Sequence, residues 1–404
     1  MLFFNLHKPY NVRMPRVKCK KCEKDETIIR SGFIRGRQRF FCKECDYHFT
    51  IQIDFQKRKA SKRKDHSTTI IDIAKAIGVS ISTVSRALKD HSDISQETKN
   101  VVKQVAAELN YQPNTLAQSL TKRETRTIGV IIPDIETYFF ASILTGIQNI
   151  ASSVGYKVMI SQSRESHETE VANVHTFITN WVDGLLICHS KETTTFDHIK
   201  LNLKRGIPII QFDRVCEELN TSKVLLDDVD GSFQITEHMI EQGFKRIAII
   251  VGPERLYVSK KRLEGYLKAL KKYGVYADPF LIRYTDLTKQ AILDEVDNLL
   301  EKDKSIDAFF CISDMGAVNI IVHLKRKGIQ IPQQIGVAGF GNDPTGEIIE
   351  PSLTSFNPQT YKCGEVVAQM FFDQILDGDD HVAQTKTVKG SLIQRSSTLR
   401  DHKI

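Results

Sequence analysis

The chain has 404 residues, of which 41% are hydrophobic, so it is long enough to form several domains with sizeable cores. No apolar run reaches the length of a membrane-spanning helix, and the opening Met-Leu-Phe-Phe-Asn-Leu is too short and too soon polar for a secretory signal. The net charge of +7 is uneven, because residues 1–67 carry 18 Lys and Arg against 7 Asp and Glu while residues 127–404 are net acidic. We therefore expect a cytoplasmic protein with no membrane segment, whose N-terminal end meets a polyanion.

Eight cysteines form two groups. Cys19, Cys22, Cys42 and Cys45 make two Cys-x2-Cys pairs with nineteen residues between them, a spacing typical of a four-thiolate structural zinc site. Strand-like segments at 27–30 and 39–42, with Gly32 and Gly36 in the turns, predict a zinc ribbon over residues 17–50 that holds one zinc per chain and needs it to fold. Disulfides are the alternative, and a cytoplasmic location disfavours them. The scattered cysteines are expected to be buried, reduced thiols: Cys188, Cys216, Cys311 and Cys363.

The ribbon also carries a resemblance. Lys18-Cys-x-x-Cys, Gly36-Arg-Gln-Arg-Phe-Phe-Cys-x-x-Cys and Phe49 resemble the zinc ribbon at the start of many insertion-sequence transposases, although no further transposase feature follows. Arginines at positions 30, 35, 37 and 39 and a basic linker over residues 51–67 favour an accessory DNA contact. A protein-docking role and a captured gene fragment remain alternatives, and Met14 offers a second translation start beside Met1.

Residues 68–113 predict a small helical DNA-binding unit, which we call the headpiece. Thr69 and Asp72 form a capping box, apolar residues repeat at helical spacing, and Gly78 is placed to end the helix. Ser80 caps a second helix that turns Val84, Ala87 and Leu88 inward and leaves Ile81, Ser82, Ser85 and Arg86 outside. The pattern is that of a helix-turn-helix with its recognition helix, and an ordinary helical hairpin is the alternative.

Further motifs narrow this interpretation. Val79-Ser-x-Ser-Thr-Val-Ser-Arg86, Ile94-Ser-Gln-Glu-Thr-Lys, Leu109-Asn-Tyr-Gln-Pro-Asn-Thr-Leu-Ala-Gln-Ser-Leu120 and Arg126-Thr-Ile-Gly-Val-Ile-Ile-Pro-Asp134 closely resemble the lactose/galactose repressor family. The resemblance continues to the C-terminus and implies a dimeric regulator with a helix-turn-helix, a hinge helix and an effector-binding core built like periplasmic sugar-binding proteins. The family usually begins almost at the helix-turn-helix, so the ribbon departs from its pattern.

By this resemblance, Ile81, Ser82 and Arg86 read bases, with Arg86 suited to a bidentate contact with guanine. Thr69, Ser80, Thr83 and Ser85 are expected to position phosphates or cap helices. Residues 114–126 match the hinge and its linker. Too short to be stable alone, this helix is expected to form when two copies pair on DNA, with Leu120 wedged into the central base step. Gln118 stands where Arg is more common, and a plain linker is the alternative. The hinge residues expected to contact DNA are Asn114, Ala117, Gln118 and Leu120.

From residue 127 to 404, apolar strand-like runs alternate with helical segments and predict two lobes of parallel α/β units around a cleft. The runs are 128–132, 157–160, 184–187, 208–212, 246–251, 281–284, 308–312 and 335–339. By resemblance, Asp213, Arg262 and Asp314 bind the effector through charge-assisted hydrogen bonds and Phe139 offers a stacking face. These groups suit sugar hydroxyls and, nearly as well, a purine.

The expected fold is therefore multidomain: a small zinc ribbon, an all-α helix-turn-helix headpiece, and a two-lobed α/β core of the type I periplasmic-binding-protein kind. The sequence contains neither a Gly-x-Ser-x-Gly elbow nor a phosphate-binding loop, so no such motif indicates catalysis. We expect a non-enzymatic transcription regulator, a repressor, that binds a pseudo-palindromic double-stranded operator as a homodimer and responds to a small effector, with a sugar as the first candidate. A regulator responding to a purine or another metabolite, and a DNA-binding protein derived from a mobile element, are the alternatives.

Overall fold

The computed structural model describes residues 18–25, 27–34, 37–50, 68–112 and 124–400. The chain divides into two compact units, residues 1–113 and 114–404, which we describe separately. Within the described ranges, no helix combines the length and the apolar character needed to cross a membrane.

The ribbon is a three-stranded antiparallel sheet. Its strands are β1 (Ile28–Ile34), β2 (Arg37–Cys42) and β3 (Tyr47–Thr50), in that order. Gly32 lies inside β1, so the prediction that it lies in a turn is wrong. The register of the β1–β2 pair shifts between Arg30 and Phe33. Phe40 and Phe49 are buried beside Cys19 and Cys42 in a core that is too small to be stable by hydrophobic burial alone.

The headpiece contains α1 (Ile70–Ile77), α2 (Ile81–Leu88) and α3 (Gln96–Glu108). Gly78 ends α1 in the left-handed conformation, at φ 70°, as its position predicts. The Ser80 hydroxyl accepts a hydrogen bond from the Thr83 N–H and so caps α2. Ile73, Val84, Ala87 and Val102 form the centre of a small core shared by the three helices.

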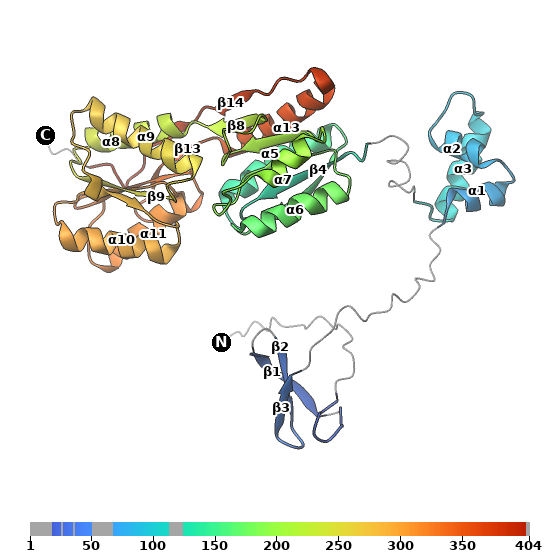
Figure 1. Cartoon of the computed structure of the whole chain (residues 1–404), viewed down its shortest axis with the longest axis horizontal. Coiled ribbons are helices and arrows are strands. Elements are labelled where there is room, and N and C mark those ends of the chain that lie inside the picture. The colour runs from blue at the N-terminus through green and yellow to red at the C-terminus, as the bar shows by residue number, and fades with distance from the viewer. Residues whose placement is uncertain (1–17, 26, 35–36, 51–67, 113–123, 401–404) are drawn as a thin grey trace. The chain divides into compact units, whose positions relative to one another are not determined.

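The remainder of the chain forms a core of two lobes, each a six-stranded sheet covered by helices on both faces (Figure 1). The N-terminal lobe consists of β4 (Thr127–Ile132), α5 (Tyr138–Ser153), β5 (Lys157–Gln162), α6 (His167–Thr179), β6 (Gly184–Ile187), α7 (Asp197–Leu203), β7 (Ile209–Phe212), β8 (Ser222–Leu226), α13 (Thr360–Asp377) and β14 (Thr385–Val388). The C-terminal lobe consists of α8 (Asp228–Glu241), β9 (Ile247–Val251), α9 (Tyr257–Lys272), β10 (Ile282–Tyr284), α10 (Lys289–Lys302), β11 (Ala308–Cys311), α11 (Asp314–Arg326), β12 (Gly336–Phe340), α12 (Thr345–Ile348), β13 (Thr354–Asn357) and β15 (Ser391–Ile393).

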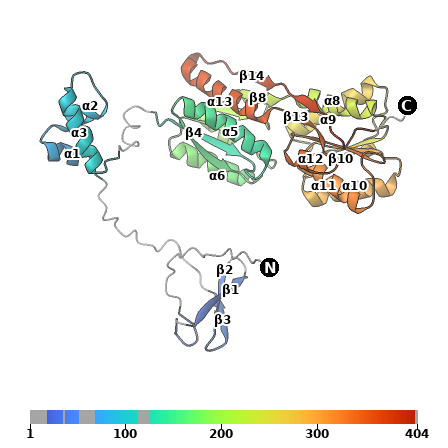
Figure 2. The same cartoon turned by 180° about the vertical axis from the view of Figure 1, so that it is seen from behind.

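The strand order is β14-β8-β7-β6-β4-β5 in the N-terminal lobe and β10-β9-β11-β12-β13-β15 in the C-terminal lobe. Only the β13–β15 pair is antiparallel among the described strands of the core. Helices α5 and α13 cover one face of the first sheet and α6 and α7 the other (Figures 1 and 2). In a parallel sheet the carboxyl ends of the strands meet at one edge, and that is where a ligand is expected.

The chain crosses between the lobes three times, between β8 and α8, between β13 and α13, and between β14 and β15. The crossings lie side by side, because Asn357 pairs with Ser391 and the Lys389 ammonium lies 2.7 Å from the Asp227 carboxylate. Two glycines fix the helices that follow the first two crossings. A Cβ on Gly265 would lie 2.1 Å from the Val229 oxygen of α8, and one on Gly364 of α13 would lie 2.0 Å from the Ile143 oxygen of α5. The backbones of these helix pairs are therefore in direct contact.

Candidate DNA-binding surface, effector cavity and cysteine cluster

The residues predicted to read bases lie on the outer face of α2. Ile81 is 48% exposed although it is large and apolar, and Ser82 is also exposed. Arg86 is half exposed and forms an ion pair with Asp93, which follows α2. An exposed isoleucine flanked by polar side chains at the start of a helix is an arrangement that can contact a base methyl group in a DNA groove.

The residues predicted to position phosphates surround this face. Thr69 precedes α1 and donates its backbone N–H and hydroxyl to the Asp72 carboxylate, at 2.8 and 2.7 Å. Ser80 caps α2, and its hydroxyl lies 2.8 Å from that of Thr83. Ser85 and Thr83 are half-buried. The predicted hinge residues Asn114, Ala117, Gln118 and Leu120 lie outside the described residues.

All four predicted effector residues line one cavity of about 180 Å³ between the lobes. Phe139 and Asp213 reach it from the N-terminal lobe, and Arg262 and Asp314 reach it from the C-terminal lobe. Phe139 comes from the first turn of α5 and packs edge-on against Phe140, with ring centroids 5.1 Å apart. An aromatic face opposite a group of charged side chains is a common arrangement in sites that bind small polar molecules.

Asp213 directly follows β7 and has a left-handed backbone, at φ 58°, a conformation that aspartate tolerates better than most residues. Its Oδ2 accepts a long hydrogen bond, of 3.6 Å, from the Cys188 thiol, while its buried Oδ1 has no hydrogen-bond partner. Burial raises the pKa of Asp213. The neighbouring Arg214 is bound by both oxygens of Glu165, at 2.7 and 2.9 Å. The Asp213 Oδ1 atom is therefore an unpaired polar atom in this wall of the cavity.

Arg262 is a buried cation whose contacts are largely set by the protein. Its Nε donates to Asp228 at 2.8 Å, its Nη1 donates to the Ile312 carbonyl at 2.7 Å, and its guanidinium lies 3.8 Å from the Phe340 ring centroid. Asp228 keeps its other oxygen buried without a partner, and burial raises its pKa to about 6 despite the attraction of Arg262.

Asp314 is the first residue of α11 and is 4% exposed. Its two oxygens accept hydrogen bonds from the Ser355 hydroxyl at 2.7 Å and from the Asp343 N–H at 2.6 Å. Burial outweighs these bonds and raises the pKa of Asp314 to about 6. Each oxygen retains a further lone pair for a donor on a ligand.

Asp228, Thr137 and Ser259 were not among the residues predicted from the sequence. The hydroxyl oxygens of Thr137 and Ser259 are buried without partners and their residues line the cavity, as is the case for Asp213, whereas Asp228 lies behind Arg262 and is not part of the lining. Asp228 is the first residue of α8 and lies two positions after the end of β8, a strand that was not predicted from the sequence. The two hydroxyls gave no signal in the sequence, since their place depends on how the lobes meet.

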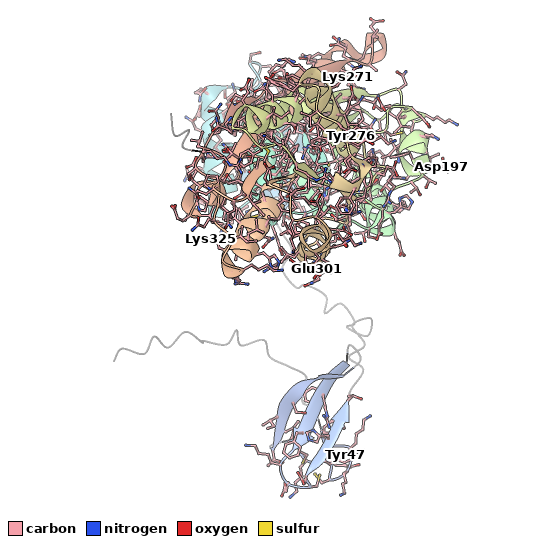
Figure 3. All side chains as sticks on the ribbon, turned by 90° about the vertical axis from the view of Figure 1, so that its left-hand side faces the viewer. Tyr47, Asp197, Lys271, Tyr276, Glu301 and Lys325 are labelled. Carbon is pink, nitrogen blue, oxygen red and sulfur yellow. The ribbon has the colours of Figure 1, made fainter. Side chains whose placement is uncertain are left out.

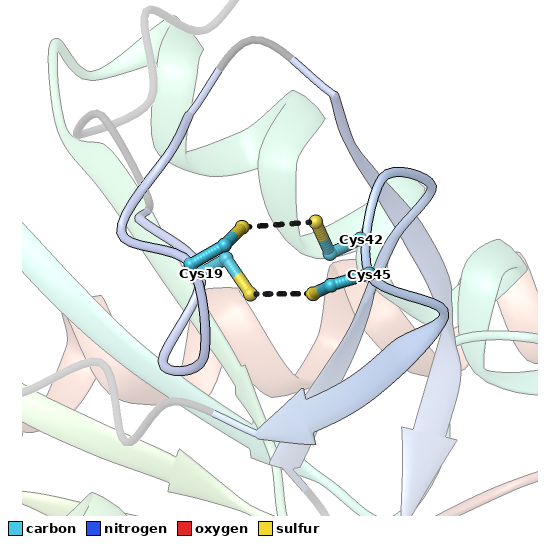
Figure 4. A group of neighbouring side chains, drawn as sticks. Cys19, Cys42 and Cys45 are labelled. Atoms are coloured by element: carbon cyan, nitrogen blue, oxygen red, sulfur yellow. Dashed lines mark hydrogen bonds between the residues drawn. The ribbon is translucent and has the colours of Figure 1, made fainter.

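The four N-terminal cysteines lie close together, as their spacing predicts (Figure 4). Sulfur atoms of Cys19 and Cys45 are 3.5 Å apart and those of Cys22 and Cys42 are 3.6 Å apart, too far for disulfide bonds. Zinc–sulfur bonds of about 2.3 Å in a tetrahedron place sulfurs about 3.8 Å apart, close to these distances. Hydrogen bonds from the backbone N–H groups of Cys45 and Glu44 lower the pKa of Cys42 to about 6, whereas burial raises the pKa of Cys45 to about 12.

The outer surface of the ribbon is open to solvent. Tyr47 is 39% exposed on its third strand (Figure 3). The Lys24 ammonium is paired with Glu44, with side chains 60% and 43% exposed. Of the four arginines noted in the sequence, only Arg39 has a described side chain. The other four cysteines of the chain are buried and form no disulfide bonds, as predicted.

Comparison with known proteins identifies two segments. Residues 69–114 match the model of bacterial regulatory proteins of the lacI family, and residues 125–396 match periplasmic binding proteins and the sugar binding domain of the LacI family. Neither match includes the ribbon.

Individual proteins are similar over the same region. The HTH-type transcriptional repressor CytR of Escherichia coli strain K12 is 31% identical over 338 residues, which are 84% of this chain and 98% of that protein. The ribose operon repressor of Halalkalibacterium halodurans is 32% identical over 313 residues, 76% of this chain and 90% of that protein. The structure of the Lac repressor dimer bound to operator and the anti-inducer ONPF has a TM-score of 0.73 at 24% identity, covering 82% of this chain and 99% of that chain. The last similarity concerns the fold.

Proposed function

Because this chain belongs to the LacI family of bacterial regulatory proteins, we propose that it acts in the cytoplasm as a homodimeric repressor. We propose that it binds a pseudo-palindromic operator and that a sugar-like effector controls this binding. It is a DNA-binding transcription regulator controlled by a small molecule rather than an enzyme. The observation that carries the proposal is the cavity between the lobes, where buried polar atoms without partners surround Arg262.

The charge of the cavity limits what this effector can be. Asp213 and Asp314 place two buried carboxyl groups there, whereas the lining cations Arg214 and Arg262 are already paired with Glu165 and Asp228. A phosphate or carboxylate on the ligand would face these groups without a free cation and would be disfavoured. The site favours a neutral or cationic molecule with several O–H or N–H donors, such as an unphosphorylated sugar or an amino sugar.

A thermal-shift screen of the full-length protein tests this proposal. The panel holds neutral monosaccharides and disaccharides, amino sugars, the corresponding sugar phosphates, and nucleobases. We expect a neutral or amino sugar to raise Tm, since a ligand at a hundred times its Kd stabilises a protein by about 2.7 kcal/mol.

Asp213→Ala should remove the shift, and Asp197→Asn, whose side chain is 88% exposed on the N-terminal lobe, should retain it. A sugar phosphate as the best ligand would contradict the charge argument. A nucleobase as the best ligand would replace the sugar proposal with the purine alternative.

On the headpiece, we propose that Ile81, Ser82 and Arg86 contact bases and that Thr69, Ser80, Thr83 and Ser85 contact phosphates or hold the helix ends. Support comes from the exposed face of α2 and from the capping contacts described above. Asn114, Ala117, Gln118 and Leu120 are proposed to contact the minor groove, on the strength of the sequence resemblance alone.

For the ribbon, we propose one structural zinc bound by Cys19, Cys22, Cys42 and Cys45, and an accessory contact with DNA phosphates. Four thiolates complete a tetrahedral site, so this zinc would hold the two loops together and leave no position for a substrate. Metal analysis of the reduced protein should find that Cys42→Ser holds one zinc ion per chain fewer than the wild type. Zinc content unchanged by this substitution would exclude the four-cysteine site.

A further inference from the structure

A second group of metal-ligating side chains lies inside the N-terminal lobe. Glu170 from α6, His189 after β6 and His198 from α7 converge, with Glu170 Oε1 lying 2.9 Å from His189 Nδ1 and 2.9 Å from His198 Nε2. The side chains are 0%, 4% and 7% exposed. Asp197, the neighbour of His198 on α7, lies at the surface instead (Figure 3). Burial of all three groups distinguishes this cluster from ordinary surface charges.

The hydrogen bonds around His189 determine which of its nitrogens can bind a cation. Gln211 is fully buried, and its amide is oriented by Cys216, whose N–H donates to Oε1 at 2.7 Å and whose carbonyl accepts from Nε2 at 3.3 Å. His189 Nε2 lies 2.9 Å from Gln211 Oε1, an acceptor, so this nitrogen must carry a proton. In the neutral ring, Nδ1 therefore has its lone pair directed at the Glu170 carboxylate.

Glu170 is held as a carboxylate from its other side. The Ser190 N–H and the Thr193 hydroxyl donate to Oε2 at 2.6 and 2.9 Å. A lone pair of neutral His189 and a carboxylate oxygen cannot face each other at 2.9 Å unless a cation, either a proton or a metal ion, lies between them.

We propose that Glu170, His189 and His198 form a binding site for a first-row transition-metal ion such as Zn²⁺. Two imidazoles and one carboxylate are a ligand set that such ions accept, with water or the nearby His167 as the fourth ligand. The bonds from Gln211, Ser190 and Thr193 are the outer contacts that orient metal ligands. A metal–ligand distance of about 2.1 Å requires the three atoms to spread by about 0.5 Å, a movement that side-chain rotations can supply.

The site would also act on the cleft, through four consecutive residues after β6. The Cys188 thiol contacts Asp213 in the effector cavity, the His189 N–H donates to the Arg214 carbonyl at 3.3 Å, and the Ser190 N–H donates to Glu170. The Lys191 carbonyl accepts a hydrogen bond of 2.9 Å from Arg255 Nε across the cleft. A metal ion at this cluster would therefore fix the segment that joins the effector wall to the opposite lobe.

Metal counting on the full-length protein tests the proposal. The protein is stripped of metal, equilibrated with Zn²⁺ in reducing buffer at neutral pH, desalted and analysed. We expect two zinc ions per chain in the wild type, one in His198→Gln and one in Cys42→Ser. His175→Gln removes an exposed histidine from α6, the helix that carries Glu170, and this variant should retain two zinc ions per chain. Zinc in the core then depends on His198 and zinc in the ribbon depends on Cys42, so either site can fail without the other.

A second measurement avoids relying on a variant of the buried cluster. In Cys42→Ser, which lacks the ribbon site, Zn²⁺ should raise the Tm of the core whereas Mg²⁺ should not, and Co²⁺ should give visible absorption without thiolate charge-transfer bands. Equal zinc content in His198→Gln and wild type, or an unchanged Tm of Cys42→Ser with Zn²⁺, would overturn the metal site and leave a proton as the cation between His189 and Glu170.

Discussion

At the scale of single residues, the arginine that we propose to read a base already forms an ion pair in the free protein. Arg86 is paired with Asp93, and both side chains are more than 40% exposed. An exposed ion pair of this kind contributes less than about 1 kcal/mol, so DNA can compete for the guanidinium. The ion pair therefore holds Arg86 only weakly.

Arg86→Ala should lose discrimination of one base pair by about 1–3 kcal/mol and largely spare weak binding to unrelated DNA. Asp93→Asn should do the reverse and strengthen specific binding by a few fold, since it frees Arg86. Titrations of operator variants at fixed salt would measure both effects. A uniform loss on every DNA sequence in Arg86→Ala would assign the residue to phosphate contact.

The raised pKa of Asp314 predicts how the stability of the ligand-free core depends on pH. The folded state holds the Asp314 proton up to about pH 6, whereas the unfolded chain releases it near 3.8. The favourable contribution is therefore complete below pH 4 and is lost as pH rises through 6. Asp314→Asn should stabilise the ligand-free protein by up to about 3 kcal/mol at pH 8 and by much less at pH 4. Denaturant unfolding at both pH values measures this, and an equal effect at both would refute it.

The sequence predicted the charged residues of the cavity better than its neutral ones. Four residues that the family resemblance assigns to the effector line one cavity: Phe139, Asp213, Arg262 and Asp314. Asp228 was missed because β8, Ser-Lys-Val-Leu-Leu, has alternating buried and half-buried residues and is weakly apolar. The buried glutamate–histidine cluster has no local spacing pattern, since its members come from three elements.

At the scale of elements, the caps of α2 explain why its exposed face can carry so many polar residues. Ser80 satisfies the Thr83 N–H, and Val84 and Ala87 are buried in the headpiece core. The helix is thus held from its inner face and its N-terminus, which leaves the outer side chains available for DNA.

Ser80→Ala and Ser82→Ala form a matched pair on this helix. Ser80→Ala should destabilise the headpiece by about 1 kcal/mol because the cap is removed. Ser82→Ala removes an exposed hydroxyl that caps nothing, so it should leave stability unchanged and alter operator preference. Thermal unfolding and operator titration of the two variants would show the opposite pattern if the roles were exchanged.

All eight core strands expected from apolar runs are present, with ends shifted by at most two residues. The sequence did not predict β8, β13, β14, β15 or the third strand of the ribbon. β14 and β15 are edge strands of four and three residues with mostly exposed or half-buried side chains, and Thr354–Asn357 of β13 is polar despite its burial. Their positions are set by the sheets they join rather than by their own composition.

At the scale of the whole molecule, three parts of different charge share one chain. Removal of residues 1–60 should weaken DNA binding and flatten its salt dependence, because the slope of affinity against salt is set by how many phosphates the protein neutralises. Operator preference should survive, since the base-reading residues remain. Binding measured from about 50 to 200 mM salt tests this, and an unchanged slope would favour a protein-docking role for the ribbon.

Effector and operator should be linked reciprocally, since each must change the affinity of the other by the same factor. Asp314→Ala should abolish the response to effector and leave basal operator binding largely intact. Leu120→Ala should weaken operator binding and leave effector affinity of the free protein nearly unchanged. Titration of both variants with each ligand decides the matter, and a normal response in Asp314→Ala would place the effector elsewhere.

The close helix contacts at two glycines also bear on how the two lobes of the core can move relative to each other. Helices α8 and α13 enter their lobes straight after a crossing, and at Gly265 and Gly364 their backbones lie too close to those of α9 and α5 for a Cβ atom to fit between them. The chain passes between the lobes at three adjacent crossings, at 226–228, 357–360 and 388–391. Two rigid lobes that are joined by parallel crossings move relative to each other mainly by rotation. An effector that closes the two lobes would thus change the angle between them. The N-terminal lobe would transmit this rotation to residue 124.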